Sequence, residues 1–350
     1  MNRPELHWLT ALRGFAALWV AFHHMGTSLT GISFARLGAF EVFLSRGWLG
    51  VDLFFILSGF IISYCYFDKM TNFTKEQAKI FWIKRFARVY PTHLFVLLLF
   101  VMVIGGATSL GLFTDTQDKY TFAKLIPQVL LLNGIGMFDH QGWNLPSWSV
   151  SSEFLAYLVF PIIPLILKRF TGPVKALIGI QVILSLTILM AYTFNNGQKF
   201  MLDFEFSSFR ILSEFTMGVL LYRLYTVGTP HKKYLGLALM GFAGILSQSF
   251  VTSSFYDFMY LIYFMLIIYG LALVPRAQKI FGLTFLGEIS YSLYLVHVLL
   301  IILFNQVIRK IEFLQENMLI TITLFVITMV ISARMLFKFI ENPLRKIILQ

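Results

Sequence analysis

The chain has 350 residues, of which 58% are hydrophobic and 13% are charged, and its formal net charge is +11. This composition excludes an ordinary soluble protein, and repeated apolar runs of about 20 residues indicate an all-α polytopic membrane protein. The short alternating segments of a transmembrane β-barrel do not occur. Since basic residues of membrane proteins gather in cytoplasmic loops, the positive charge does not call for a nucleic-acid partner. A single cysteine, Cys65, excludes an intrachain disulfide and a cysteine-based metal cage.

Eleven apolar runs follow one another along the chain. They lie at about 9–28, 47–67, 91–112, 122–137, 149–168, 174–194, 206–225, 233–252, 255–275, 281–304 and 317–340. The run at 122–137 is short and interrupted by Pro and Gly, so we exclude it as a span. Most of the Lys and Arg residues between the remaining runs then fall on one side of the membrane. The positive-inside rule therefore predicts ten transmembrane helices with both termini in the cytoplasm. Residues 113–148 become a long outer segment, which should be re-entrant or lie on the surface, against protein or a cavity.

The first apolar run carries two ionisable side chains, Arg13 and His24. A charged residue within the bilayer costs at least about 2.5 kcal/mol, so such residues usually serve a function. Eleven steps of about 100° return to nearly the same helix face, which puts both side chains on one stripe, about 16 Å apart in height. One end of this helix can therefore bind an anion while the other end presents an imidazole.

In the ten-span topology, several polar side chains share the outer half of the membrane. His24, Asp52 and Glu153 lie near the outer ends of their helices, and His297 lies just outside the middle of its own. A polar and aromatic stretch directly precedes the helix of Glu153; it comprises Trp143, Asn144, Ser147 and Trp148. An imidazole beside two carboxylates predicts an acid–base site that faces outward. Each carboxylate could instead pair with a buried cation in a purely structural role.

At the inner surface, Arg85 and Arg88 lie in the stretch KRFARVYP, and Arg13 lies about one and a half turns above it. Three such cations could clamp phosphates. The basic stretch could equally be a topology anchor that contacts lipid headgroups. Arg210 and Glu214 are four residues apart, so we expect a local ion pair there. The histidines show no HxH, HxxxH or HExxH spacing, and we expect no metal site.

Six sequence blocks occur in order along nearly the whole chain. They are LTALRGFAALWVAFHH, GWLGVDLFFILSGFII, IKRFARVYPTHL, NLPSWSVSSEFLAYLVFP, LGEISYSLYLVH and ENPLRK. In these blocks the chain resembles the acyltransferase-3 family of bacterial integral-membrane O-acyltransferases, whose Arg–ten residues–His pattern falls on Arg13 and His24. The sequence departs from the family after Glu153, where Phe154, Leu155 and Ala156 replace aromatic or glutamine neighbours. It also departs at Val298, where the family often has proline.

The resemblance implies transfer of an acyl group, most often acetyl, from cytoplasmic acetyl-CoA to a sugar hydroxyl of a cell-surface glycan such as O-antigen or exopolysaccharide. The setting would be the bacterial inner membrane. The three arginines would bind the CoA phosphates, and the pantetheine arm would reach towards His24. His24 would act as general base, with Glu153 or Asp52 orienting its tautomer and the stretch around Trp143 contacting the acceptor glycan. An acyl-histidine intermediate is the alternative mechanism.

Functions from two other classes remain open at this point. A transporter of a lipid-linked sugar or small solute would also carry charges within the membrane, but it predicts inverted repeats that the sequence does not show. The other is a non-catalytic scaffold for polysaccharide assembly. We expect residues 1–350 to form one integral-membrane domain without an appended extracytoplasmic domain, and the sequence leaves the oligomeric state open.

Overall fold

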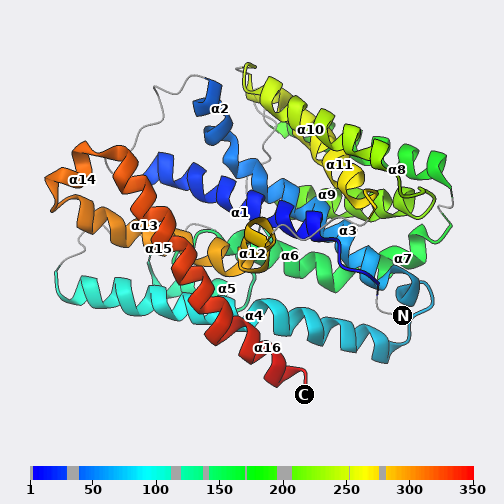
Figure 1. The fold of residues 1–350 in the computed structure, drawn as a ribbon. Coiled ribbons are helices and arrows are strands. Elements are labelled where there is room, and N and C mark those ends of the chain that lie inside the picture. The colour runs from blue at the N-terminus through cyan, green and yellow to red at the C-terminus, as the bar shows by residue number, and fades with distance from the viewer. Residues whose placement is uncertain are drawn as a thin grey trace.

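The computed structural model describes residues 3–29, 39–111, 120–136, 142–169, 172–194, 207–251, 253–275 and 281–350. Within these ranges all regular structure is helical, as the composition predicts (Figure 1). The elements are α1 (His7–Ser28), α2 (Ala39–Ser45), η1 (Arg46–Leu49), α3 (Gly50–Met70), α4 (Lys75–Ser109), α5 (Phe122–Val129), α6 (Ser147–Val159), α7 (Ile162–Leu167), α8 (Pro173–Phe194), α9 (Ser207–Tyr225), η3 (Lys232–Tyr234), α10 (Leu235–Gln248), η4 (Ser254–Phe258), α11 (Met259–Ala272), α12 (Phe281–Glu288), α13 (Ser290–Ile308), α14 (Glu312–Glu316), α15 (Met318–Leu336), η5 (Phe337–Glu341) and α16 (Asn342–Ile348).

Six helical stretches in the described part of the chain are long and apolar enough to cross a membrane. They are Phe40–Met70, Lys75–Ser109, Pro173–Phe194, Ser254–Ala272, Ser290–Ile308 and Met318–Ile348. The structure thus supports a multi-pass membrane protein, while the count of ten spans stays a prediction. Several of the other predicted spans are interrupted or polar: α10 has only 14 residues, and α9 carries charged residues at 210, 214 and 223.

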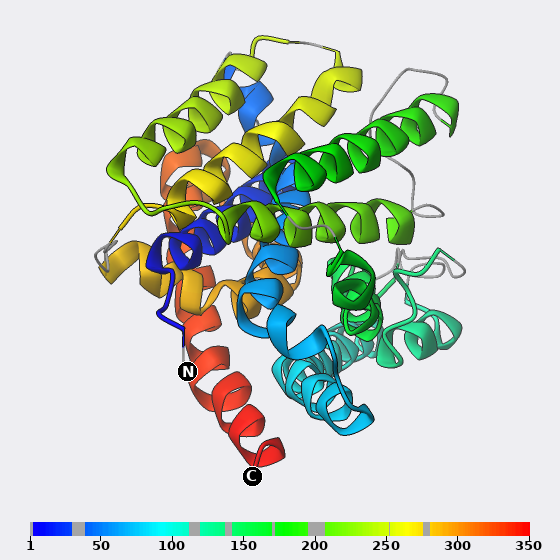
Figure 2. The ribbon, with the colours of Figure 1, turned by 90° about the vertical axis from the view of Figure 1, so that its right-hand side faces the viewer.

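Three predicted spans differ from the helices that form. The span at 91–112 belongs to a 35-residue helix, α4, which begins at Lys75 and continues through Pro91, so Arg85 and Arg88 lie within a helix. The span at 149–168 is divided into α6 and α7 beside Pro161, which lacks the N–H that a continuous helix needs. The span at 281–304 is divided at Ile289, and α12 lies across the direction of the long helices (Figures 1 and 2).

Close helix crossings depend on glycines. At the crossing of α3 and α9, a Cβ atom on Gly59 would collide with the carbonyl oxygen of Phe215, and one on Gly218 would collide with that of Ile56. Without a hydrophobic effect between helices in lipid, such close backbone approach is a main source of helix association. The α1–α12 crossing follows the same rule, because a Cβ on Gly287 would meet the Thr10 backbone. These crossings fix α1 and α3 at the centre of the bundle.

The described part of the predicted outer segment lies against protein. Residues 112–119 and 137–141 of this segment are outside the described residues. Between them, α5 is followed by a turn in which Leu131 and Asn133 are buried, and the Gln128 carbonyl oxygen lies 2.8 Å from Nε2 of His93 on α4. The backbone of this part thus finds partners on the protein, as a non-helical segment at membrane depth requires.

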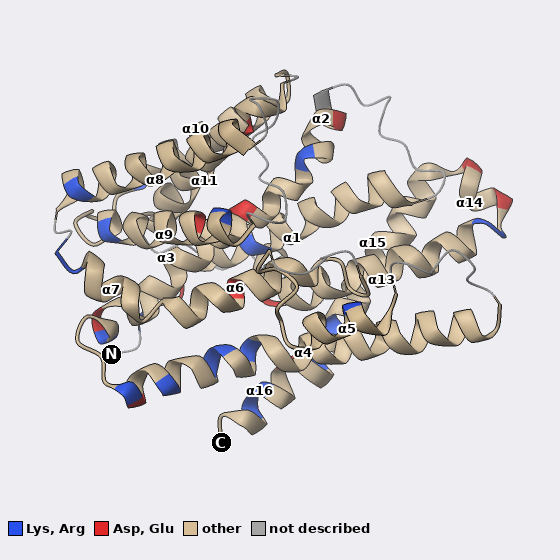
Figure 3. Ribbon diagram, turned by 180° about the vertical axis from the view of Figure 1, so that it is seen from behind, with Lys and Arg blue, Asp and Glu red and all other residues tan. Residues whose placement is uncertain are grey.

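The long helices run in roughly the same direction, and the two ends of the bundle differ in charge. Figures 1 and 3 place both termini away from α14. In Figure 3 the Lys and Arg residues gather along the first half of α4 and near the end that holds the N-terminus. This distribution agrees with the predicted excess of cytoplasmic positive charge, and the orientation stays a prediction.

Candidate active site

A cavity of about 130 Å³ lies among α1, α3, α4, α6 and α13. Its polar lining comes from five helices and comprises Arg13, Ser58, Arg85, Arg88, Ser149, Glu153, Tyr157, Ser290, Tyr291 and Tyr294. The three arginines that the sequence singled out as a phosphate clamp therefore line one space, together with the predicted carboxylate Glu153. A cavity with several cations and one carboxylate is suited to an anionic ligand.

The three arginines differ in their partners. Arg88 forms an ion pair with Glu341 of η5, and the other oxygen of that carboxylate accepts a 2.6 Å hydrogen bond from Ser292. Arg85 lies over the rings of Tyr66 and Tyr157, and its one described hydrogen bond, to the Tyr66 hydroxyl, is 3.5 Å long. Within the described ranges, Arg13 has neither an ion pair nor a hydrogen bond through its side chain. Arg13 and Arg85 are therefore the cations available to a ligand.

Glu153 is held on the cavity wall by two hydroxyl groups. Its Oε1 atom accepts a 2.8 Å hydrogen bond from Ser58 of α3 and another from Tyr157, one turn further along α6. The two hydroxyls are themselves 3.2 Å apart. This arrangement fixes the carboxylate across the α3–α6 contact. Ser58 and Tyr157 were not singled out from the sequence, although both lie within the quoted blocks.

His24 of α1 and His297 of α13 form a direct pair. Nδ1 of His24 lies 3.0 Å from Nε2 of His297, and Nδ1 of His297 lies 2.7 Å from the carbonyl oxygen of Tyr294. His297 is fully buried. Neither ring lines the cavity, but Tyr294 does, and its hydroxyl lies 2.7 Å from that of Ser149 on the same wall. The structure thus brings together the two histidines that the sequence placed on separate helices.

Asp52 lies in a different buried cluster. Arg210 of α9 donates to Asp52 through Nε at 2.7 Å and also through Nη2, and it reaches Glu214 through Nε at 3.2 Å. The predicted Arg210–Glu214 ion pair is confirmed, and Asp52 joins it across the α3–α9 contact. For Asp52, this arrangement corresponds to the purely structural role, pairing with a buried cation, that the sequence left open. The sequence could not indicate that Arg210 serves both carboxylates, because Asp52 is 158 positions away.

The four predicted acceptor-binding residues Trp143, Asn144, Ser147 and Trp148 are not among the lining of the cavity. The Asn144 backbone N–H donates to Gln128 at 2.9 Å, Ser147 accepts from Asn133 at 2.9 Å, and the Trp143 indole donates to the Thr121 carbonyl at 3.0 Å. These contacts tie the outer segment to the start of α6. A role in acceptor binding remains a prediction.

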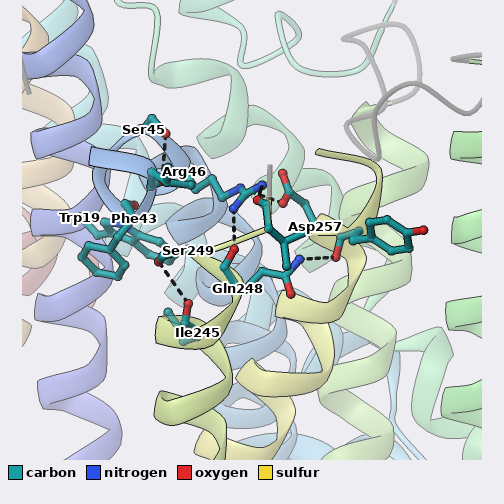
Figure 4. Close-up of polar contacts among 11 residues, drawn as sticks. Trp19, Phe43, Ser45, Arg46, Ile245, Gln248, Ser249 and Asp257 are labelled. Carbon is teal, nitrogen blue, oxygen red and sulfur yellow. Dashed lines mark hydrogen bonds and ion pairs between the residues drawn. The ribbon is translucent and has the colours of Figure 1, made fainter. Parts of the chain in front are cut away.

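A further ion pair fixes the region before α3. Arg46 is buried, and its Nε atom lies 2.8 Å from Asp257 of η4. Figure 4 shows its guanidinium between Asp257 and the turn after α10, where it also donates to the Gln248 carbonyl at 2.8 Å. The Arg46 guanidinium thus joins η1 to η4 and to the end of α10, and it belongs to the scaffold. In the described residues, no cluster of three or more His, Cys, Asp or Glu could hold a metal ion.

A sequence model of a family described as an acyltransferase domain matches residues 6–336. The acyltransferase MdmB of Streptomyces mycarofaciens is 31% identical over 44% of this chain and 38% of its own length. The peptidoglycan O-acetyltransferase OatA of Listeria monocytogenes is 25% identical over 99% of this chain and 56% of its own length. The chain thus matches about half the length or less of these two relatives. No solved structure shows a significant match.

Proposed function

The chain belongs to the acyltransferase-3 family, and we propose that it is an integral-membrane O-acetyltransferase that moves an acetyl group from cytoplasmic acetyl-CoA to a sugar hydroxyl of a cell-surface glycan. One observation carries the proposal. A single cavity is lined by Arg13, Arg85 and Arg88 and also by Tyr294, the backbone partner of the histidine pair. The cations on the cavity wall support a donor with an anionic head.

The donor side of the proposal rests on charge. CoA carries phosphate groups, and guanidinium groups bind phosphate by paired, charge-assisted hydrogen bonds. Arg13 and Arg85 make few or no hydrogen bonds and no ion pairs with other described side chains, whereas Arg88 is already paired with the Glu341 carboxylate. The positive-inside prediction places Arg85 and Arg88 towards the cytoplasm, where acetyl-CoA is made. This orientation is part of the proposal.

The chemical step then needs a base near the outer end of α1. The acceptor hydroxyl oxygen attacks the thioester carbonyl carbon, the C–O bond forms and the C–S bond to CoA breaks. His24 takes the hydroxyl proton and returns it to the departing sulfur, so charge and atoms balance. Such general-base catalysis typically contributes about 10²- to 10⁴-fold. In the alternative sequence of steps, the acetyl group passes through an acyl-His24 intermediate.

The acceptor is proposed from the relatives. The Listeria relative is named as a peptidoglycan O-acetyltransferase, and this supports a glycan acceptor for the present chain. We place the reaction in the bacterial inner membrane and propose O-antigen or exopolysaccharide sugars as acceptors. Membrane lipid surrounds the protein, and a glycan or lipid-linked glycan is its partner.

The test compares surface glycans from deletion, complemented and His24→Gln strains by mass spectrometry, with acetyl esters identified by their release in mild base. We expect the esters to disappear in the deletion and His24→Gln strains while the polymer stays. Loss of the whole polymer on deletion would instead indicate transport or assembly. Purified protein in lipid vesicles, supplied with labelled acetyl-CoA, should transfer label to isolated glycan; absence of any transfer would contradict acetyl-CoA as the donor.

A further inference from the structure

The pairing of the two histidines defines which nitrogen of His24 is basic. We infer that His297 is a positioning residue that holds His24 as its Nδ1–H tautomer and leaves Nε2 of His24 as the nitrogen that accepts the substrate proton. The inference rests on the proposed function in one respect, the role of His24 as the base. The assignment of tautomers follows from the hydrogen bonds alone.

The assignment begins at the carbonyl oxygen of Tyr294. A carbonyl oxygen only accepts hydrogen bonds, so Nδ1 of His297, at 2.7 Å, carries a hydrogen. In a neutral imidazole the other nitrogen is then bare, and Nε2 of His297 can only accept. Its partner at 3.0 Å, Nδ1 of His24, must therefore be the donor. Nε2 of His24 is then left with its lone pair, and the backbone of Val20 is a further hydrogen-bond partner of the His24 ring.

The carboxylates that usually set a histidine tautomer are engaged elsewhere. The sequence predicted Glu153 or Asp52 for this role. Glu153 accepts from Ser58 and Tyr157, and Asp52 is bound by Arg210. Within the described ranges, neither histidine of the pair hydrogen-bonds to a carboxylate. A second imidazole thus occupies the position that an acidic residue holds in a catalytic triad.

The packing makes His297 suited to this role. It is fully buried on α13, and α13 packs directly on α1, which carries His24. Its hydrogen bond to a backbone carbonyl three residues earlier on the same helix fixes the ring plane independently of any other side chain. When His24 gains the substrate proton at Nε2, its Nδ1–H still donates to a neutral acceptor. The pair can then share the positive charge through that hydrogen bond.

The test measures the tautomer of His24 directly. The protein is labelled with ¹⁵N-histidine, and the His24 signals are assigned by comparison with His24→Gln. We expect Nδ1 of His24 to be protonated and Nε2 to be bare in the neutral wild type. In His297→Leu, which removes the acceptor, we expect the Nε2–H tautomer to appear. A wild type with Nε2–H, or an unchanged tautomer in His297→Leu, would overturn the inference.

Activity provides the second readout. In His297→Gln, the side-chain oxygen falls near the position of Nε2 and can accept from His24, so activity should stay within about tenfold of wild type. His297→Leu should lower kcat by at least about 100-fold with an unchanged KM for acetyl-CoA, since a wrongly oriented base removes most of its contribution. If Leu and Gln variants are equally active, His297 does not position the base.

Two controls separate the possible failures. His23→Gln alters the neighbouring ring, which is not part of the pair, and should leave both the His24 tautomer and kcat unchanged. The thermal midpoint of each variant shows whether the fold persists. If wild-type protein lacks transfer activity but the tautomer changes as expected, the proposed function fails while the hydrogen-bond assignment stands. If transfer activity is present but the tautomer does not change, only the positioning role fails.

Discussion

The cations of the cavity illustrate how residues of one type acquire different roles. Glu341 is 2% exposed and pairs with Arg88, so removal of Arg88 leaves a buried carboxylate without its cation. Breaking such a buried pair typically costs about 3–5 kcal/mol. Arg85 instead contacts aromatic rings and has no described carboxylate partner. Loss of Arg85 should therefore affect ligand binding more than stability.

We predict that Arg85→Ala raises the KM for acetyl-CoA by about 10- to 100-fold, the loss expected for one hydrogen bond to a charged group, with a smaller change in kcat. Arg85→Lys should restore binding only in part, because an ammonium cannot form the paired contacts of a guanidinium. The measurement is initial transfer rate against acetyl-CoA concentration in lipid vesicles. An unchanged KM in Arg85→Ala would make Arg85 a topology anchor.

Arg88→Ala is predicted to behave differently, with a lower thermal midpoint in addition to any change in KM. Removing the opposing charge as well, in Arg88→Ala with Glu341→Gln, should recover part of the midpoint but not the KM. This result would separate the stabilising ion pair from phosphate binding. A double variant as unstable as Arg88→Ala alone would show that the Glu341 charge is not what destabilises the single variant.

His24 and His23 form a matched pair for a second test. They are adjacent on α1, but only His24 contacts His297. We predict that His24→Gln abolishes acetyl transfer while the protein remains inserted and abundant, since glutamine can imitate one hydrogen bond but cannot take the proton. His23→Ala should retain most activity. Near-normal ester formation in His24→Gln would move the base to His297.

At this scale the sequence was most informative about residues that share a motif. The Arg13–His24 spacing, the pair Arg85 and Arg88, and Glu153 were all singled out, and all but His24 line the cavity. The partners of these residues were not predictable: Glu341 and Arg88 are 253 positions apart, and only the packed helices bring them together. Hydrogen-bonding hydroxyls such as Ser58 carry no distinctive sequence signal.

At the scale of elements, apolar run length predicted where helices lie but not how they are interrupted. The 281–304 run predicts one span, whereas α12 ends at Glu288 and packs on α1. The reason is a tertiary contact, the close approach of Gly287 to the Thr10 backbone, which hydropathy does not contain. In α4, by contrast, the helix continues through Pro91 and carries the two arginines into the bundle.

The glycine crossing of α3 and α9 gives a prediction at this scale. Gly59→Ala should lower the thermal midpoint and the yield of folded protein, because its methyl group meets the Phe215 carbonyl and forces the helices apart. Gly105→Ala is the matched control, as a Cβ there has no neighbour within 4 Å. Gly105→Ala should be neutral or slightly stabilising, by up to about 1 kcal/mol of helix propensity. Equal midpoints for the two variants would contradict a tight crossing.

For the whole molecule, the open question is how many helices cross the membrane. Ten spans predict that the start of α4 and the turn at α14 lie on opposite sides of the membrane. If only the six long apolar stretches crossed, the same two sites would lie on one side, because seven spans separate them in the ten-span topology but only four in the six-span alternative. Figures 1 and 3 show them at opposite ends of the bundle, which favours the larger number.

Single cysteines resolve this question. Cys65 is exposed and must first be replaced by Ala, after which Lys79→Cys and Glu316→Cys place one thiol at each exposed site. A membrane-impermeant maleimide should label position 316 in intact cells and position 79 only in inverted vesicles. Thr226→Cys is a control, because both topologies put it on the side of Lys79. Labelling of positions 79 and 316 from the same side would contradict the ten-span topology, and with it the cytoplasmic access of acetyl-CoA to a site that acetylates outside the membrane.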